Sequence, residues 1–185
     1  MLKFNKNFFV RDISDKRYKH IIGVIESSKK LAERYSINKK KVFIAAALHD
    51  IAKEIHINGR DLKKIFKNDR YLIKIPPVWH SFIGSLIAKE RFKITDNEIL
   101  DAIKYHTTGH PEMNEIAKII FIADFIEPGR KYKECIDVRK KLKGKMELDK
   151  ILLLVLEKKL IYLINNNKII HPYAINLWNK LRSRF

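Results

Sequence analysis

Apolar residues recur along most of this chain at spacings of three, four and seven positions, the period of an amphipathic helix. In the segment 15–35, Ile21, Val24 and Leu31 share one such face, and the shorter segment 173–184 repeats the pattern. The other segments with this period are 80–92, 95–105, 119–126 and 146–163. We therefore predict an all-α fold built from packed helices.

Local signals set expectations for the helix boundaries and the irregular segments. Thr95 and Glu98 form a capping-box pattern, which predicts that a helix opens there. The segment 71–75 alone has a strand-like character, and five residues without a partner strand cannot build a sheet. The run 165–167 of three asparagines predicts a loop before the last helix.

The length of the chain, 185 residues, suits one domain with a substantial apolar core. We expect a single domain over 1–185, with a core over about 14–130 and C-terminal helices over about 137–184 packed on it. The chain has no run of about 18 apolar residues. Residues 1–10 lack the features of a signal peptide. These observations predict a cytoplasmic protein without a membrane partner.

The doublet His49-Asp50 is the strongest chemical signal in the sequence, because it follows the apolar run 42–48 directly. Burying an unpaired carboxylate costs roughly several kcal/mol, so a cation is expected beside it. We place the doublet in a core helix. A helix-end pair, in which the carboxylate accepts the imidazole proton, is the alternative explanation.

Four further residues stand in comparable positions. His20 lies on an apolar helix face, His80 begins a predicted helix, His106 closes one, and Asp124 is the lone acid of an apolar run. A lone histidine in such a place is usually a satisfied core residue, so none of them is decisive by itself. Taken together with the doublet, the four residues predict a metal site.

This ordered series resembles the HD-domain phosphohydrolases, and specifically the YqeK family. The similarity covers roughly residues 14–181 in order. It implies a compact HD-domain helical bundle that cleaves diadenosine tetraphosphate symmetrically into two ADP. The sequence blocks that carry it are Leu48-His49-Asp50-Ile51-Ala52-Lys53, Trp79-His80-Ser81, Ala102-Ile103-Lys104-Tyr105-His106-Thr107-Thr108-Gly109 and Ala123-Asp124-Phe125-Ile126-Glu127-Pro128-Gly129-Arg130.

The resemblance also implies a dinuclear site for divalent transition metals, with Asp50 as the bridging ligand. Imidazole and carboxylate ligands suit iron, manganese or zinc better than magnesium, and we favour iron. A metal lowers the pKa of bound water toward about 7, so we expect a metal-bound hydroxide to attack an inner phosphorus. The implied ligands are His20, His49, Asp50 and Asp124 for one metal, and Asp50, His80 and His106 for the other.

Cationic and polar residues near these ligands are candidates for binding phosphate. Lys53, one helical turn beyond His49, and Arg130 are expected to join Asp50 in catalysis. The family pattern commonly has arginine where this chain has His110, so that contact is expected to be weaker or pH-dependent. The candidate substrate-binding residues are Lys53, Thr107, Thr108, Gly109, His110 and Arg130.

The formal net charge of +18 and the pI near 9.9 favour a polyanionic partner, and a non-enzymatic RNA-binding module is one reading of them. The basic residues are, however, scattered along the chain, and aromatic residues do not interleave with them as base stacking would require. We therefore prefer an enzyme whose positive field attracts a nucleotide.

Two questions stay open at this point. Metal ligands fix a reaction type and not a substrate, so an HD phosphohydrolase or phosphodiesterase acting on another nucleotide is the alternative. An apolar helix face over 161–164 could serve a homodimer. The single Cys135 excludes a disulfide within the chain.

Overall fold

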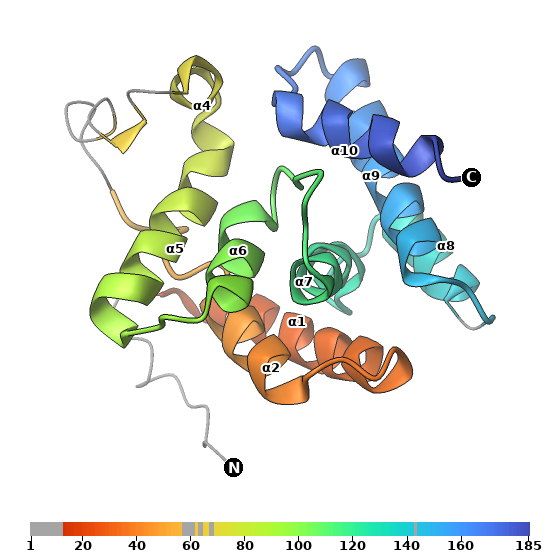
Figure 1. Ribbon diagram of the computed structural model, residues 1–185, viewed down its shortest axis with the longest axis horizontal. Coiled ribbons are helices and arrows are strands. Elements are labelled where there is room, and N and C mark those ends of the chain that lie inside the picture. Colours follow the sequence, from red (N-terminus) through yellow and green to blue (C-terminus); the bar gives the residue numbers. More distant parts are fainter. Residues whose placement is uncertain (1–12, 57–61, 63–64, 67–68, 143) are drawn as a thin grey trace.

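The computed structural model describes residues 13–56, 62, 65, 66, 69–142 and 144–185, and every regular element in these residues is helical (Figure 1). This confirms the predicted all-α fold. A short 3-10 turn, Pro76–Val78, precedes α5. The α-helices are α1 (Asp15–Arg34), α2 (Lys39–Leu48), α4 (Arg70–Lys74), α5 (Trp79–Phe92), α6 (Asn97–Tyr105), α7 (Glu115–Ile126), α8 (Lys133–Lys141), α9 (Leu148–Asn165) and α10 (Pro172–Arg182).

Helix α7 is the centre of the bundle. It packs against α1, α2 and α6 on one side and against α8 and α9 on the other, as Figure 1 shows. The five residues from Ile119 to Ala123 have no exposed surface. A helix that is apolar all round is stable only in such a buried place. The acid that follows this run, Asp124, is therefore held in the interior.

The remaining helices pack in pairs around α7. The pairs α1 and α2, α5 and α6, and α9 and α10 each contact one another. In Figure 1 the pair of C-terminal helices lies on the side of α7 away from α5. The helices α1, α2, α5 and α6 thus form the part of the bundle that contains most of the candidate ligands.

The predicted N-cap of α6 is wrong by one residue. Asp96, and not Thr95, is the N-cap of this helix, and its carboxylate accepts a hydrogen bond from the Glu98 backbone amide at 2.9 Å. Asp96 also pairs with Lys41 of α2 at 2.8 Å. The Asp96 carboxylate caps one helix and binds a second, so it stabilises the structure in two ways. A Thr95 hydroxyl could cap the helix but could not form the ion pair.

The strand-like character of the segment 71–75 is also misleading. Its first four residues belong to the short helix α4, and Ile75 is the C-cap of that helix. The Asp69 side chain accepts hydrogen bonds from the backbone amides of Tyr71 and Leu72, both at 3.0 Å. This N-cap starts the helix. Pro76 follows directly and cannot continue it, so apolar composition alone was a poor guide over these few residues.

Helix α9 carries the apolar face named above. Ile161 is 51% exposed and Ile164 is 61% exposed, so the face is on the surface as expected. A homodimer through it stays a prediction. Among the described residues, no helix has both the length and the apolar character needed to cross a membrane.

Because α7 fills the centre of the bundle, shortening one of its buried side chains should leave a cavity. We expect Ile120→Ala to lower the free energy of unfolding by about 2–5 kcal/mol, measured by urea denaturation. The matched control is Ile164→Ala, an identical change at an exposed site, which should cost less than about 0.5 kcal/mol. Equal losses in the two variants would contradict the central role of α7.

Candidate metal centre

The fold brings all six predicted ligands together beside α7. Four of the six are more than nine-tenths buried, and the other two, His20 and Asp124, have side chains that are only 11% and 14% exposed. Such burial is rare for ionisable groups that lack a charged partner. They come from α1 (His20), the end of α2 (His49 and Asp50), α5 (His80), the end of α6 (His106) and α7 (Asp124).

Asp50 is the centre of this cluster, and its two oxygens face different histidines. Oδ1 lies 3.2 Å from His80 Nε2 and 3.5 Å from His106 Nε2. Oδ2 lies 3.5 Å from His20 Nε2 and 3.6 Å from His49 Nε2. One carboxylate therefore lies between two separate pairs of imidazoles.

The donor atoms are close enough for each group to share a cation. The nitrogen and oxygen atoms of His20, His49 and Asp50 lie within 4.8 Å of one another, as do those of Asp50, His80 and His106. Asp124 joins the first group through His20, at 3.2 Å between Oδ1 and Nε2. Imidazole and carboxylate ligands of this kind fit a divalent transition metal.

Hydrogen bonds on the far side of the rings fix the orientation of the histidines. His49 Nδ1 lies 2.7 Å from the Ala46 carbonyl oxygen, and His106 Nδ1 lies 2.8 Å from that of Ile103. A carbonyl can only accept a hydrogen bond, so Nδ1 carries the proton in both rings. The bare Nε2 atoms then face Asp50 as electron-pair donors.

The electrostatics at His49, His106 and Asp50 favour the protonation states that a metal site needs. Burial lowers the pKa of His49 to about 4, and burial also lowers that of His106. Burial alone would raise the pKa of Asp50, but its interactions with the surrounding imidazole groups outweigh this effect and hold that pKa well below its ordinary value. Neutral imidazoles beside ionised carboxylates are the forms that bind a cation.

The backbone at the doublet differs from the expected core helix. Helix α2 ends at Leu48, His49 is its C-cap, and a turn follows in which the Lys53 amide donates to the Asp50 carbonyl at 3.0 Å. In a continuing helix, adjacent side chains would point roughly 100° apart. The turn allows His49 and Asp50 to face the same cluster. Lys53 therefore lies in this turn and not, as expected from the sequence, one helical turn beyond His49.

The comparisons with known proteins agree with this geometry. The family model of the HD domain matches residues 17–129. A Bacillus subtilis (strain 168) protein named symmetrical bis(5'-nucleosyl)-tetraphosphatase is 31% identical over 177 residues, which are 94% of this chain and 93% of that protein. The chain belongs to this family of HD-domain proteins. The resemblance inferred from the sequence is confirmed.

Two further proteins are similar to this chain over most of its length. A Staphylococcus aureus (strain NCTC 8325 / PS 47) protein with the same name is 33% identical and covers 90% of this chain and 87% of its own length. A crystal structure from Clostridium acetobutylicum, described as a "predicted HD superfamily hydrolase involved in NAD metabolism", superimposes with a TM-score of 0.85 at 34% identity. It covers 97% of this chain and 95% of that one.

Three of the predicted substrate-binding residues contact the HD ligand cluster. Lys53 Nζ lies 3.2 Å from His80 Nδ1, and the Thr107 hydroxyl oxygen lies 3.2 Å from His80 Nε2. The Arg130 guanidinium donates to Asp124 Oδ1 at 2.8 Å. Lys53 and Arg130 thus stand at opposite halves of the ligand set.

The other three predicted substrate residues have contacts elsewhere. The buried Thr108 hydroxyl donates to the Gly109 carbonyl. Gly109 has a φ of +70° and packs so tightly that an added Cβ would lie 2.7 Å from Leu177 Cδ2. His110 stacks on Tyr105, with 4.5 Å between ring centroids. These positions suit a helix-ending turn and its packing, so their substrate role stays a prediction.

Arg17 is a residue of the HD centre that sequence reasoning missed. Its guanidinium forms an ion pair with Asp50 Oδ2, and its Nε lies 3.9 Å from Glu54 Oε1. That buried Nε makes no hydrogen bond within the described part of the chain. The available signal was its position three residues before His20, which places both on one face of α1.

Glu127 is a second missed residue, and it supports His20. Only 4% of it is exposed, and its carboxylate lies 3.2 Å from His20 Nδ1. The same carboxylate accepts a hydrogen bond from the Gly129 amide at 2.5 Å. The space for it exists because α1 has a glycine at Gly23, where an added Cβ would lie 2.6 Å from Glu127 Oε2.

Lys159 is the third missed residue, and it comes from α9, outside the matched HD segment. Its ammonium lies over the ring of Phe121, 4.0 Å from the centroid. Burial lowers the pKa of Lys159 to about 8, against the charge of Asp124, which raises it. The C-terminal helices therefore add a cation to the electrostatic surroundings of the HD centre.

The close approach of Gly23 to Glu127 predicts an effect of Gly23→Ala on the metal centre. The new methyl group should displace the carboxylate and release His20, lowering the affinity for Mn²⁺ about tenfold or more, as measured by titration with the metal. Gly84→Ala is the matched control, because its Cβ would meet only ordinary contacts at 3.4 Å or beyond. Unchanged Mn²⁺ affinity in Gly23→Ala would contradict the support assigned to Glu127.

Proposed function

We propose that this protein hydrolyses diadenosine tetraphosphate symmetrically to two ADP at a centre for two divalent transition metals, with iron as the favoured metal. The observation that carries the proposal is the position of Asp50 between two pairs of imidazoles. The names of the Bacillus and Staphylococcus relatives, which match over most of their length, support the substrate.

The donor set supports transition metals over magnesium. Magnesium prefers an oxygen shell with retained water, whereas each proposed group here offers at least two imidazole nitrogens. Asp50 would serve both ions, with His20, His49 and Asp124 on one side and His80 and His106 on the other. When bound, such metals supply an activated water and neutralise charge on phosphate oxygens.

The chain's own cations would hold the tetraphosphate across the centre. Lys53 lies at the His80 end, and the Arg130 guanidinium lies at the Asp124 end. A phosphate chain bound between them would have its middle at Asp50, so the central bond would be the one presented for cleavage. Arg130 can also grip phosphate with two parallel hydrogen bonds. Thr107 adds a hydroxyl beside His80.

The strong positive charge supports the same substrate class. A formal net charge of +18 raises the local concentration of a polyanion and accelerates its association. Arg17, Lys53 and Arg130 concentrate this charge at the HD centre itself. A nucleotide with four phosphates would satisfy these cations better than a monophosphate.

Hydrolysis of another nucleotide is the second candidate, and the description of the Clostridium neighbour as involved in NAD metabolism favours it. The products separate the two. Two equal nucleoside diphosphates mean symmetrical cleavage of a dinucleoside tetraphosphate, whereas a nucleoside plus phosphate or a linear dinucleotide means that the substrate is another nucleotide.

Removal of Asp50 tests the metal centre. We expect Asp50→Ala, and likewise His49→Ala, to lose bound metal and nearly all turnover, because Asp50 belongs to both groups of donors and His49 to the first. The measurement is anaerobic turnover of diadenosine tetraphosphate by protein reconstituted with iron(II) or Mn²⁺, with ADP separated by chromatography and bound metal counted. About two metals per wild-type chain are expected. Full activity in the metal-depleted variant would refute the mechanism.

Removal of Arg130 tests substrate binding separately. We expect Arg130→Ala to raise the transition-state barrier by roughly 2 to 4 kcal/mol, the range for losing a charged donor, with metal content intact. The check is kcat/KM beside a metal count. Lys131→Ala is the matched control, since it removes the same charge at the neighbouring, exposed position. Loss of metal from Arg130→Ala would refute the assignment.

A further inference from the structure

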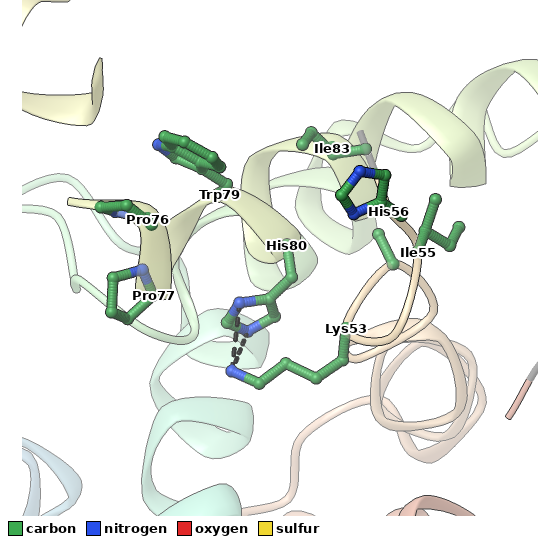
Figure 2. Close-up of a pocket in the computed structure, with 9 residues that line it drawn as sticks. Lys53, Ile55, His56, Pro76, Pro77, Trp79, His80 and Ile83 are labelled. Atoms are coloured by element: carbon green, nitrogen blue, oxygen red, sulfur yellow. Dashed lines mark hydrogen bonds between the residues drawn. The ribbon is translucent and has the colours of Figure 1, made fainter. Parts of the chain in front are cut away.

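A pocket adjoins the candidate metal centre (Figure 2). Most of the residues that line it have no role in the proposed cleavage of the phosphate chain. Its volume is about 300 Å³. Lys53 and His80, whose contact Figure 2 shows, form one end of it, and His80 is itself one of the candidate ligands. The rest of its wall is mainly apolar or aromatic, from Ile55, His56, Pro76, Pro77, Trp79 and Ile83.

The size and polarity of the pocket fit one part of a nucleotide. Small-molecule sites span about 300–1,000 Å³, so this pocket is at the lower end and suits one nucleoside rather than a whole dinucleotide. The polar end, at Lys53, matches the phosphates. Ile83 and Pro77 offer no hydrogen-bond donor to an anion, so the apolar end suits a flat, weakly polar ring.

Trp79 gives the pocket a rigid aromatic surface. Its indole Nε1 donates a hydrogen bond to the Leu72 carbonyl at 2.5 Å, which fixes the ring. The ring also packs against Phe66, with 6.4 Å between centroids and 35° between planes. The adjacent Pro76 and Pro77 have restricted backbones. A surface held in this way loses little conformational entropy when a ligand stacks on it.

We propose that this pocket binds the nucleoside of one half of the substrate, with the base stacked on Trp79 and its phosphates directed past Lys53 to the metal centre. The proposal rests on the proposed function, because it takes the substrate to be a nucleotide. It adds a specificity site formed by the turn after α2 and the start of α5. Trp79, Pro77 and Ile83 become the residues that recognise the base.

The indole of Trp79 reports on the pocket directly. The chain has two tryptophans, so Trp178→Phe leaves Trp79 as the only one. In this variant loaded with Mn²⁺, we expect ADP to quench or shift the indole emission, whereas inorganic pyrophosphate, which lacks the nucleoside, should leave it nearly unchanged. Equal responses to ADP and pyrophosphate, or no response to ADP, would overturn the proposal.

A variant that fills the pocket tests the same idea through binding. We expect wild-type protein with Mn²⁺ to bind ADP at least tenfold more tightly than pyrophosphate in calorimetry. Ile83→Trp should remove this preference while its pyrophosphate affinity and metal content stay unchanged. Leu86→Trp, on the same helix but 47% exposed, is the matched control and should keep the preference. Parallel losses of ADP and pyrophosphate affinity in Ile83→Trp would reject the pocket.

These measurements separate the pocket from the proposed function. Protein that prefers ADP to pyrophosphate but does not cleave diadenosine tetraphosphate to ADP would keep the nucleoside pocket and refute the substrate. Protein that cleaves it, but whose Trp79 emission and Ile83→Trp binding show no dependence on the nucleoside, would keep the function and refute the pocket. Thermal unfolding of Ile83→Trp beside wild type shows whether the variant is folded, and the Trp178→Phe experiment leaves the pocket wall intact.

Discussion

The buried carboxylate of Asp50 is the constraint on which the rest of the centre depends. An ionised acid that is 3% exposed is costly unless positive charge or hydrogen bonds surround it. Here the Arg17 guanidinium of α1 supplies such a charge, and four imidazoles from α1, α2, α5 and α6 face the same carboxylate, where they could share a cation with it. Satisfying this group therefore positions four helices relative to one another, and α7 supplies the apolar wall behind them. The packing of these helices and the assembly of the ligand set therefore depend on each other.

The ligands could be predicted from the sequence because each breaks a strong local pattern. Asp124 interrupts a run of apolar residues, and His49-Asp50 follows an alanine-rich one. Arg17 and Lys159 could not be found in this way, because a basic residue on a helix of a strongly basic protein is ordinary. Glu127 belongs to a loop in sequence, and only the fold places its carboxylate against His20.

The errors in the local structure have a common physical origin. Helical periodicity identified the long helices well, since their apolar faces are set by burial. The end of α2 and the short helix α4 depend instead on a few hydrogen bonds, such as those that Asp69 accepts. A single capping side chain decides such a boundary, and periodicity over five residues cannot detect it. The turn that directs Asp50 into the cluster is of this kind, so the position of the ligand was predictable while the reason for its orientation was not.

Two carboxylates of the ligand set are also paired with arginine side chains. Arg17 and a cation shared by His20, His49 and Asp50 would compete for the same atom, Asp50 Oδ2. Arg130 is likewise paired with Asp124 Oδ1, which faces His20. A metal that took these oxygens would leave two guanidinium groups without their acids, in a centre that already contains Lys53. A polyphosphate would restore the balance of charge, so binding of the metal and of the substrate would favour each other through the shared carboxylates.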